Sequence, residues 1–195
     1  MKSDTVLTKR IVAGKYKGKT LKLPSKDTTR SSKAIVLESF FNTLQFDVID
    51  SVLVEVFSGS GSIGLEALSR GAKRVFFMEK DRDALKALRA NIAQTDPNAC
   101  EVYEGDSFST ITQVKKRLEL LGESAFVYID PPFSFREGME EIYEKMLLLI
   151  ASLPLSIVQL ITIEHMSTLE LPESIGQFRR LKTKRFGKTS LTYYA

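Results

Sequence analysis

Residues Val52–Gly61 read VLVEVFSGSG and run on as SIGLEALSRG, and this stretch decides the fold. It opens as an apolar run rich in β-branched residues and breaks into small residues at Ser58–Gly61. The order is therefore strand and then glycine-rich turn, and a helix follows, because apolar side chains recur at helical spacing at Ile63, Leu65, Ala67 and Leu68. Gly59, Gly61 and Gly64 fit the pattern G-x-G-x-x-G. The small residues of this pattern let a ligand approach the backbone at a helix N-terminus.

The order of strand and helix repeats through most of the chain. Further strands are predicted at Arg74–Glu79, Cys100–Tyr103, Ala125–Ile129 and Ile157–Glu164, and helices at Ser32–Leu44, after Asp81, between Asp106 and Gly122 and at Gly138–Ala151. The last segment, Phe178–Ala195, reads as two strands that turn at Gly187-Lys188. The pattern predicts an α/β, Rossmann-like, doubly wound sheet of seven mostly parallel strands, closed by a C-terminal antiparallel hairpin.

The N-terminal segment differs from this pattern. Arg10–Leu23 alternates apolar and basic residues about Gly14 and Gly18, which predicts a short β-hairpin with one charged face. We therefore divide the chain into a basic N-terminal extension, residues 1–30, and a main domain, residues 31–195. With 195 residues and 43% hydrophobic content, the chain can bury one core, and we expect a monomer.

The composition also excludes several classes of protein. No apolar run approaches the roughly 18 to 20 residues that cross a bilayer, and Met1–Arg10 is too polar for a secretory signal, so a cytoplasmic protein without a membrane partner is expected. A single cysteine, Cys100, and a single histidine, His165, exclude an internal disulfide and disfavour a metal site. We interpret Cys100 as core filler and His165 as a structural residue at a strand end.

Basic residues are concentrated at the two ends of the chain. The formal net charge is +4, yet most cations lie before residue 34 or between residues 179 and 188, so the middle of the chain is acidic. This distribution favours a surface for a polyanion built from both ends, whereas the plainer alternative is solvated charge and a floppy tail.

The residues that follow the strands are the candidate site residues, because ligands of such sheets bind at the carboxyl ends of the strands. They are Ser58–Gly61, Glu79, Asp106 and Asp130–Phe133. Glu79 lies about 20 residues beyond the glycines, a separation at which an acid can bridge the hydroxyls of a ribose. Asp106 is explained equally well as a ligand contact or as the N-cap of the next helix.

The most specific signal is the sequence Asp130-Pro131-Pro132-Phe133. Two consecutive prolines give a stiff loop that presents hydrogen-bond acceptors, the Asp130 carboxylate and the Pro131 carbonyl. Two such acceptors would hold the hydrogens of an exocyclic amino group and direct its lone pair at an electrophile. Phe133 would stack on an extruded base. By itself the loop could also simply end a strand.

Together these motifs resemble the RsmD-type bacterial 16S rRNA guanine-N2 methyltransferases, which belong to the class I S-adenosylmethionine-dependent methyltransferases. The resemblance covers nearly the whole chain. It rests on Arg10–Gly14 with Lys17-Gly18-Lys19, Glu38 with Phe41-Asn42, Phe57–Gly61, Gly64–Ala72 and Asp130–Phe133.

The resemblance implies methylation of the N2 of a guanine in 16S rRNA, within the small ribosomal subunit or an assembly intermediate, with S-adenosylmethionine as cofactor. It implies a target site at Asp130, Pro131, Pro132 and Phe133, and a cofactor site formed by Glu55, Phe57, Ser58, Gly59, Ser60, Gly61, Glu79, Lys80, Asp106, Ser107 and Asp130. It implies RNA contacts at Arg10, Lys15, Lys17, Lys19, Arg30, Lys33, Asn42, Lys184 and Arg185.

The chain departs from the family pattern at a few positions. It has Glu55 where Asp is usual, Ser31-Ser32 where Pro-Thr is usual, and Leu37 where Arg is usual. Three other functions remain as alternatives: an adenine-N6 methyltransferase on DNA or RNA, a nicotinamide-dependent oxidoreductase, and a non-catalytic RNA-binding assembly protein. The oxidoreductase explains the glycines and Glu79 but not Asp130–Phe133.

Overall fold

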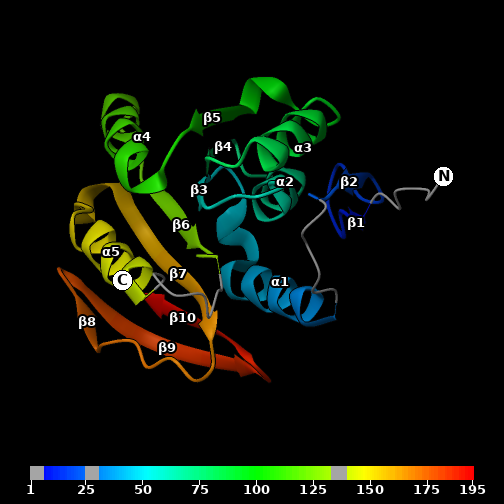
Figure 1. Cartoon of the computed structure of the whole chain (residues 1–195). Coiled ribbons are helices and arrows are strands. Elements are labelled where there is room, and N and C mark those ends of the chain that lie inside the picture. The colour runs from blue at the N-terminus through cyan, green and yellow to red at the C-terminus, as the bar shows by residue number, and fades with distance from the viewer. Residues whose placement is uncertain (1–6, 25–30, 133–139) are drawn as a thin grey trace.

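The predicted strand and turn at Val52–Gly61, with the helix that follows them, lie at the centre of the computed structural model, which describes residues 7–24, 31–132 and 140–195 (Figure 1). The strands are β1 (Thr8–Arg10), β2 (Thr20–Lys22), β3 (Val52–Val56), β4 (Arg74–Glu79), β5 (Cys100–Glu104), β6 (Ala125–Ile129), β7 (Val158–Met166), β8 (Ser174–Ile175), β9 (Phe178–Phe186) and β10 (Thr189–Tyr194). The helices are α1 (Ser31–Leu44), α2 (Ser62–Ser69), α3 (Arg82–Ile92), α4 (Ser107–Leu121) and α5 (Glu140–Ala151), with short 3-10 helices η1 (Gln45–Val48), η2 (Pro97–Ala99) and η3 (Leu155–Ile157).

The main sheet is mostly parallel and has the order β5-β4-β3-β6-β7-β10-β9-β8. Strands β3 to β7 run parallel, and β10 pairs antiparallel with both β7 and β9. The two-residue strand β8 adds an eighth strand to the seven that the sequence predicts. The strand order reverses at β3, which pairs with β4 on one side and β6 on the other, and such a reversal marks the ligand crevice in open sheets.

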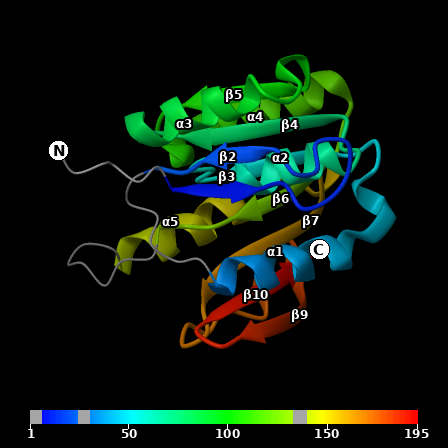
Figure 2. The same cartoon turned by 90° about the vertical axis from the view of Figure 1, so that its right-hand side faces the viewer.

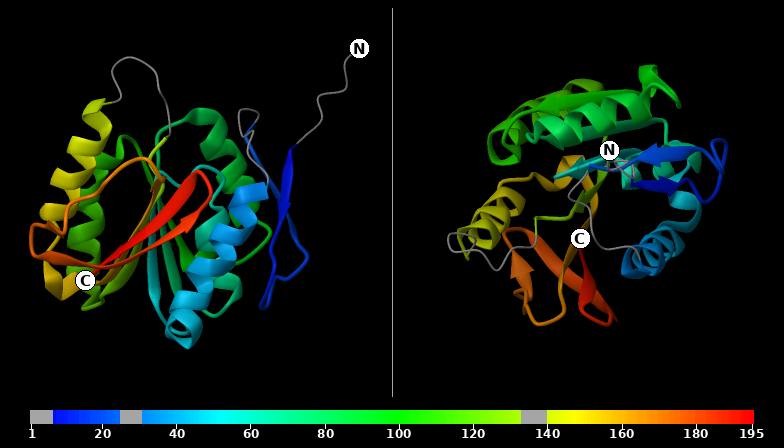
Figure 3. Two further views of the ribbon diagram at one scale, coloured as in Figure 1. Left: turned by 90° about the horizontal axis from the view of Figure 1, so that it is seen from below. Right: turned by 45° about the vertical axis from the view of Figure 1, so that its right-hand side comes forward.

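Helices cover both faces of the sheet, which explains why the central strands are apolar at nearly every position. All five residues of β3 and of β6 are buried. Helices α1, α2 and α3 pack on one face, and α4 and α5 pack on the other (Figure 3). Gly64 lets α2 approach β4 closely, because a Cβ there would lie 2.5 Å from side-chain atoms of Phe77 and Val75.

The predicted N-terminal hairpin forms from β1 and β2, and its connection packs on α2 and α3 on the side away from the sheet (Figures 2 and 3). The buried carboxylate of Glu66 accepts hydrogen bonds from the Val12 and Ala13 amides at 2.8 and 3.1 Å. The Ser69 hydroxyl accepts from the Tyr16 amide at 2.9 Å. These hydrogen bonds fix the hairpin to α2, so its charged face has a defined position.

Most predicted boundaries agree with the structure within two residues. Asp81 caps α3 by accepting from the Asp83 and Ala84 amides, and Gly122 ends α4 in the left-handed conformation. The helix predicted at Gly138–Ala151 is observed from Glu140 onward, and the two residues before Glu140 lie outside the described ranges. Cys100 is partly buried and packs against the core, and burial raises the pKa of its thiol to about 12.

Candidate active site

A central pocket opens at the carboxyl ends of β3, β6 and β7, where the strand order predicts the ligand crevice. It is lined by Lys9, Val36, Glu55, Phe57, Ser58, Gly59, Ser60, Ser62, Ile63, Asp130 and Glu164. The structure therefore brings together six of the predicted site residues, namely Glu55, Phe57, Ser58, Gly59, Ser60 and Asp130. We call residues 57–61 the glycine loop and this cavity the central pocket.

Glu55 lies at the bottom of the central pocket, below the N-terminus of α2. Its Oε2 accepts a hydrogen bond from the Gly64 amide at 2.8 Å, and its Oε1 accepts from the Ile63 amide at 3.2 Å. Burial raises the pKa of Glu55 to about 8, although the two amides and the nearby Lys9 ammonium act in the opposite direction. A buried carboxyl with this pKa gains a strong preference for its charged form when a cation binds beside it.

Glu79 supports the glycine loop from the neighbouring strand. Its Oε2 accepts from the Gly59 amide at 2.7 Å, and its Oε1 accepts from the Lys80 and Asp81 amides, both at 2.8 Å. Gly59 has a φ of 54°, and a Cβ built on it would meet nothing within 4 Å, so this part of the loop is open to a ligand. The carboxylate thus holds the backbone of the loop in a left-handed turn that favours glycine.

The structure shows the capping role of Asp106, and its role as a ligand contact stays a prediction. Its side chain caps α4 by accepting from the Phe108 amide at 2.9 Å, and it also pairs with Lys80 at 3.1 Å. Partial burial acts to raise the pKa of Asp106, but the Phe108 amide and the Lys80 ammonium outweigh this effect, and the pKa is lowered. Phe108, which follows the buried Ser107, meets the ring of the pocket residue Phe57 edge to face at 5.6 Å. Lys80, Asp106 and Ser107 themselves do not line the central pocket.

The other wall of the pocket contains the predicted amine-binding loop. Asp130 lines the pocket, Pro131 is buried and Pro132 is exposed, whereas Phe133 lies outside the described residues. Facing Asp130 is Glu164 of β7, whose carboxylate accepts a hydrogen bond from the buried Tyr128 hydroxyl. Burial, together with the charges of Glu164 and Asp130, raises the pKa of Tyr128, so this phenol stays protonated as a donor. The pocket therefore presents three carboxyl groups, which is a suitable environment for amines and cations.

The predicted RNA contacts occupy several different surfaces. Arg10, Lys15, Lys17 and Lys19 are exposed on the hairpin, Asn42 is exposed on α1, and Arg185 is exposed on β9. The Lys15 and Lys19 ammonium groups lie over the Tyr16 ring at 5.2 and 5.6 Å. Lys184 instead faces α1, with its Nζ 3.1 Å from the Thr43 hydroxyl, and burial lowers its pKa. Arg30 lies outside the described ranges, and only the backbone of Lys33 is described, as part of α1.

Sequence reasoning missed the pocket residues Lys9, Val36, Ser62, Ile63 and Glu164, and it missed Asn91, which supports the glycine loop. Lys9 reaches the central pocket from β1, with its Nζ 3.4 Å from the Ser62 hydroxyl, and only the basic character of the hairpin could have suggested it. Glu164 stands out in the sequence only as the neighbour of His165. Asn91, on α3, has no exposed surface and joins the hairpin to the glycine loop. In the sequence, the only indication of this role was that Asn91 is a polar residue on the apolar face of a predicted helix.

Two absences hold for the part of the chain that the structure describes. In residues 7–24, 31–132 and 140–195, no helix is long and apolar enough to cross a membrane. Within the same ranges, no three His, Cys, Asp or Glu side chains are grouped in a way that could hold a metal ion.

Comparison with known proteins identifies the family. Residues 9–195 match the model of the family described as Conserved hypothetical protein 95. The chain is 29% identical over 189 residues, 95% of its own length and 97% of the relative's, to a Bacillus subtilis protein provisionally named as the rRNA methyltransferase YlbH. It is 33% identical over 135 residues, 68% of each chain, to Ribosomal RNA small subunit methyltransferase D of Haemophilus influenzae.

A solved structure agrees with these relatives. An Escherichia coli protein provisionally described as the methyltransferase yhhF superposes with a TM-score of 0.76 at 25% identity, covering 96% of this chain and 97% of that one. The agreement extends through the hairpin, the central sheet and the C-terminal strands, since almost the whole of both chains is included. The chain therefore belongs to the Conserved hypothetical protein 95 family, the family of the RsmD-type rRNA methyltransferases.

Proposed function

We propose that this protein transfers the methyl group of S-adenosylmethionine to the exocyclic N2 of a guanine in 16S rRNA of the small ribosomal subunit. One observation carries the proposal: the glycine loop and Asp130 line the same pocket, at the point where the strand order reverses. A cofactor loop and an amine-binding loop that share one cavity can place a methyl donor against an amino group.

The residues present suit S-adenosylmethionine. The cofactor supplies an activated methyl group on a sulfonium, and its amino acid part carries an ammonium. The buried Glu55 carboxyl offers a partner for that ammonium, and Gly59 leaves the loop open for close approach. Glu79, at the end of β4, is the residue we assign to the ribose, and Asp106 with Lys80 the residues near the base. Lys9 has the charge to bind the carboxylate of the amino acid part.

On the acceptor side, the protein has to position a weakly nucleophilic amine. The Asp130 carboxylate and the Pro131 carbonyl would hold the two hydrogens of the guanine amino group, which directs the nitrogen lone pair at the methyl carbon. Asp130 would accept the proton that the guanine nitrogen loses when the methyl group is transferred to it. Phe133 would stack on the extruded base. The step needs positioning and electrostatics, with no protein nucleophile.

The RNA partner is supported by charge and by the relatives. The hairpin is fixed to α2 through Glu66 and Ser69, so its basic residues form a surface of defined shape. Lys9 reaches the central pocket, whereas the backbone of Lys15 and the side chain of Lys19 contact the chain at Ser69 and Gln94, at the other end of α2 and α3. Two relatives of this chain are named as small-subunit rRNA methyltransferases, and a third is provisionally named as an rRNA methyltransferase. We extend this role to the present chain, acting as a monomer whose residues 1–30 are an RNA-contacting extension of the domain at 31–195.

The decisive experiment is transfer of a labelled methyl group onto small subunits purified from cells that lack the gene. We expect label in the rRNA at one guanine, located by nuclease mapping and mass spectrometry as the N2-methyl nucleoside. Label in adenine would replace the proposal by an N6 methyltransferase. Cofactor binding without transfer to free rRNA, assembly intermediates or mature subunits would instead support a non-catalytic RNA-binding protein.

A further inference from the structure

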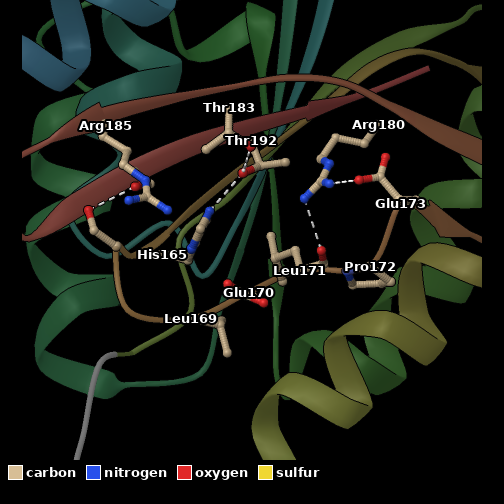
Figure 4. A pocket seen from close by; sticks show the side chains of 12 residues that line it. His165, Leu169, Glu170, Leu171, Pro172, Glu173, Arg180, Thr183, Arg185 and Thr192 are labelled. Carbon is tan, nitrogen blue, oxygen red and sulfur yellow. Dashed lines mark hydrogen bonds and ion pairs between the residues drawn. The ribbon is translucent and has the colours of Figure 1, made fainter.

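A second cavity lies on the other side of β7 from the central pocket, and the proposed reaction uses none of it. It is formed by β7, β9, β10 and the segment 167–173, and Figure 4 shows its lining side chains. These are His165, Ser167, Leu169, Glu170, Leu171, Pro172, Glu173, Arg180, Thr183, Arg185, Ser190 and Thr192. We call this cavity the β9 groove.

The floor of the groove is a chain of hydrogen bonds that runs through Thr183, Thr192 and His165. Nδ1 of His165 lies 2.9 Å from the Met166 carbonyl oxygen, which can only accept, so the ring carries its proton on Nδ1. Burial lowers the pKa of His165, and the ring is therefore neutral near pH 7. Its Nε2 must then accept from the Thr192 hydroxyl at 2.7 Å, and Thr192 in turn accepts from the Thr183 hydroxyl at 2.9 Å.

This direction determines what the groove can recognise. The hydrogen of the exposed Thr183 hydroxyl is used within the chain, so Thr183 presents an acceptor to a ligand. Glu170 adds an exposed carboxylate on the facing segment. A ligand must therefore bring N–H or O–H donors to this part of the groove, as the edge of a nucleobase does.

The two arginines of the groove have different roles. Arg180 pairs with Glu173 and donates to the Leu171 carbonyl at 3.1 Å, so it fixes the segment that forms one wall (Figure 4). Arg185 lies at the other end of the groove, close enough to His165 to lower the pKa of its ring. Among the described residues, Arg185 forms no ion pair or hydrogen bond with another side chain. Its guanidinium is exposed and can bind a phosphate in bidentate geometry.

The position of the groove relates it to the central pocket. Glu164 and His165 are consecutive residues of β7, and successive side chains of a strand point to opposite faces of a sheet. Glu164 lines the central pocket, and His165 lines the β9 groove. The two cavities are therefore separated by the end of one strand.

We propose that the β9 groove holds a nucleotide of the substrate RNA that flanks the modified base, with its phosphate on Arg185 and its base edge at Thr183 and Glu170. This inference rests on the proposed function, since it assumes an RNA whose target base occupies the central pocket. It adds a specific nucleotide site to the general attraction between basic residues and RNA, and it explains a polar cavity that the methyl transfer leaves unused.

The test compares Arg185→Gln and Thr183→Val with Arg179→Gln, which removes the same charge from β9 outside both cavities. Methyl transfer to unmodified small subunits is measured against subunit concentration and salt. For Arg185→Gln we expect a rise of about five- to tenfold in the KM for subunits and a decrease of about 0.7 in the slope of log affinity against log salt. Thr183→Val should raise the same KM without changing the salt slope. Cofactor affinity should be unchanged in each variant.

Equal KM values for Arg185→Gln and Arg179→Gln would overturn the groove proposal and leave the proposed function intact. If the wild-type protein transfers no methyl group to any subunit, the proposed function fails, and the groove is tested alone by NMR titration with a guanosine-containing RNA dinucleotide. Amide shifts at Ser190 and Thr192 that disappear in Arg185→Gln support the site. No shift in the wild-type protein overturns it.

Discussion

Asn91 donates a hydrogen bond from its side-chain nitrogen to the Ser60 carbonyl at 3.0 Å, and this contact joins α3 to the glycine loop. The same side chain binds the backbone of Lys22 in the hairpin twice, through Nδ2 to the carbonyl at 2.9 Å and through Oδ1 from the amide at 2.8 Å. One buried amide therefore connects the proposed RNA-binding hairpin with the proposed cofactor site.

Replacing Asn91 by Ala should weaken both connections. One buried and two partly buried backbone groups lose their partner. A buried unsatisfied group costs about 1 to 3 kcal/mol, and water can reach the other two, so we expect destabilisation of about 2 kcal/mol. Denaturant unfolding measures this loss. Calorimetry with S-adenosylhomocysteine should show weaker binding, because the glycine loop is less well fixed. Gln94→Ala, in the exposed turn that follows α3, is the control, and equal behaviour of the two variants would contradict the connection.

The raised pKa of Glu55 predicts that cofactor binding depends on pH. A cofactor ammonium favours the carboxylate, so binding below pH 8 must release the proton that Glu55 holds in the free protein. Affinity for S-adenosylhomocysteine should therefore rise by up to about tenfold per pH unit between pH 6 and 7.5, where the ligand amine is mostly charged. Calorimetry in buffers of different ionisation enthalpy should detect close to one released proton. In Glu55→Gln the rise should be absent.

The raised pKa of Glu55 also predicts that the stability of the protein without cofactor falls as pH rises, whereas its affinity for the cofactor increases. Because the pKa of Glu55 is raised from 4.5 in the unfolded chain to about 8 in the folded protein, its uncharged form favours folding. This contribution is fully present below about pH 4.5 and is lost as pH rises toward 8. The free energy of unfolding of Glu55→Gln should therefore depend less on pH over this window than that of the wild-type protein. Parallel curves for the two proteins would mean that Glu55 is ionised throughout.

Asp130→Asn tests the amine-binding role. The amide keeps one acceptor and nearly the same volume but cannot take up the proton, so we expect methyl transfer to fall by about two to four orders of magnitude. Cofactor affinity should change little, because Glu55 and the glycine loop remain. Single-turnover transfer and calorimetry measure the two quantities. Full transfer by Asp130→Asn or by Phe133→Ala would remove this loop from the mechanism.

Much of the fold and part of the site could be predicted from the sequence, for physical reasons that particular residues illustrate. Buried parallel strands such as β3 and β6 require continuous apolar runs, and Asp81 and Gly122 have local conformational roles that their sequence positions reveal. The residues after the strands are also predictable, because parallel strands all end at the same edge. This is why Gly59, Glu79 and Asp130 were identified together, whereas Glu55, which lies inside β3, was identified only through the family resemblance.

The contacts between distant segments could not be predicted in the same way. Lys9, Asn91 and Glu164 join the site through pairings across 31 or more residues, which no local pattern records. The difference between Lys184 and Arg185 depends on which face of β9 is covered by α1, and a basic run does not specify this. The β9 groove likewise exists only because the segment 167–173 folds back over the end of the sheet.

The three lysines of the hairpin connection, Lys15, Lys17 and Lys19, predict the salt dependence of RNA binding. Replacing all three by Gln should weaken binding to rRNA and reduce the slope of log affinity against log salt by about 0.7 to 0.9 for each phosphate that the variant no longer binds. Filter binding at several salt concentrations measures the slope. Replacing Lys115 and Lys116, which lie on α4 on the opposite face of the sheet, gives the matched control. An unchanged slope in the triple variant would remove the hairpin from the RNA surface.

Two glycines of the hairpin allow the contact between the hairpin and α2 to be tested without changing the charge of the hairpin. Gly14 and Gly18 have similar left-handed φ values of 82° and 86°, so an alanine at either position should bring a similar backbone strain of about 1 kcal/mol. Only Gly14 meets a neighbour, since a Cβ there would lie 1.7 Å from the Ser69 carbonyl oxygen, whereas a Cβ on Gly18 would meet nothing within 4 Å. We expect Gly14→Ala to displace the hairpin from α2, with faster proteolysis near residue 24 and weaker methyl transfer to subunits. Gly18→Ala should lose only the strain energy and keep its activity, and equal effects of both substitutions would show that the position of the hairpin on α2 does not matter for the reaction.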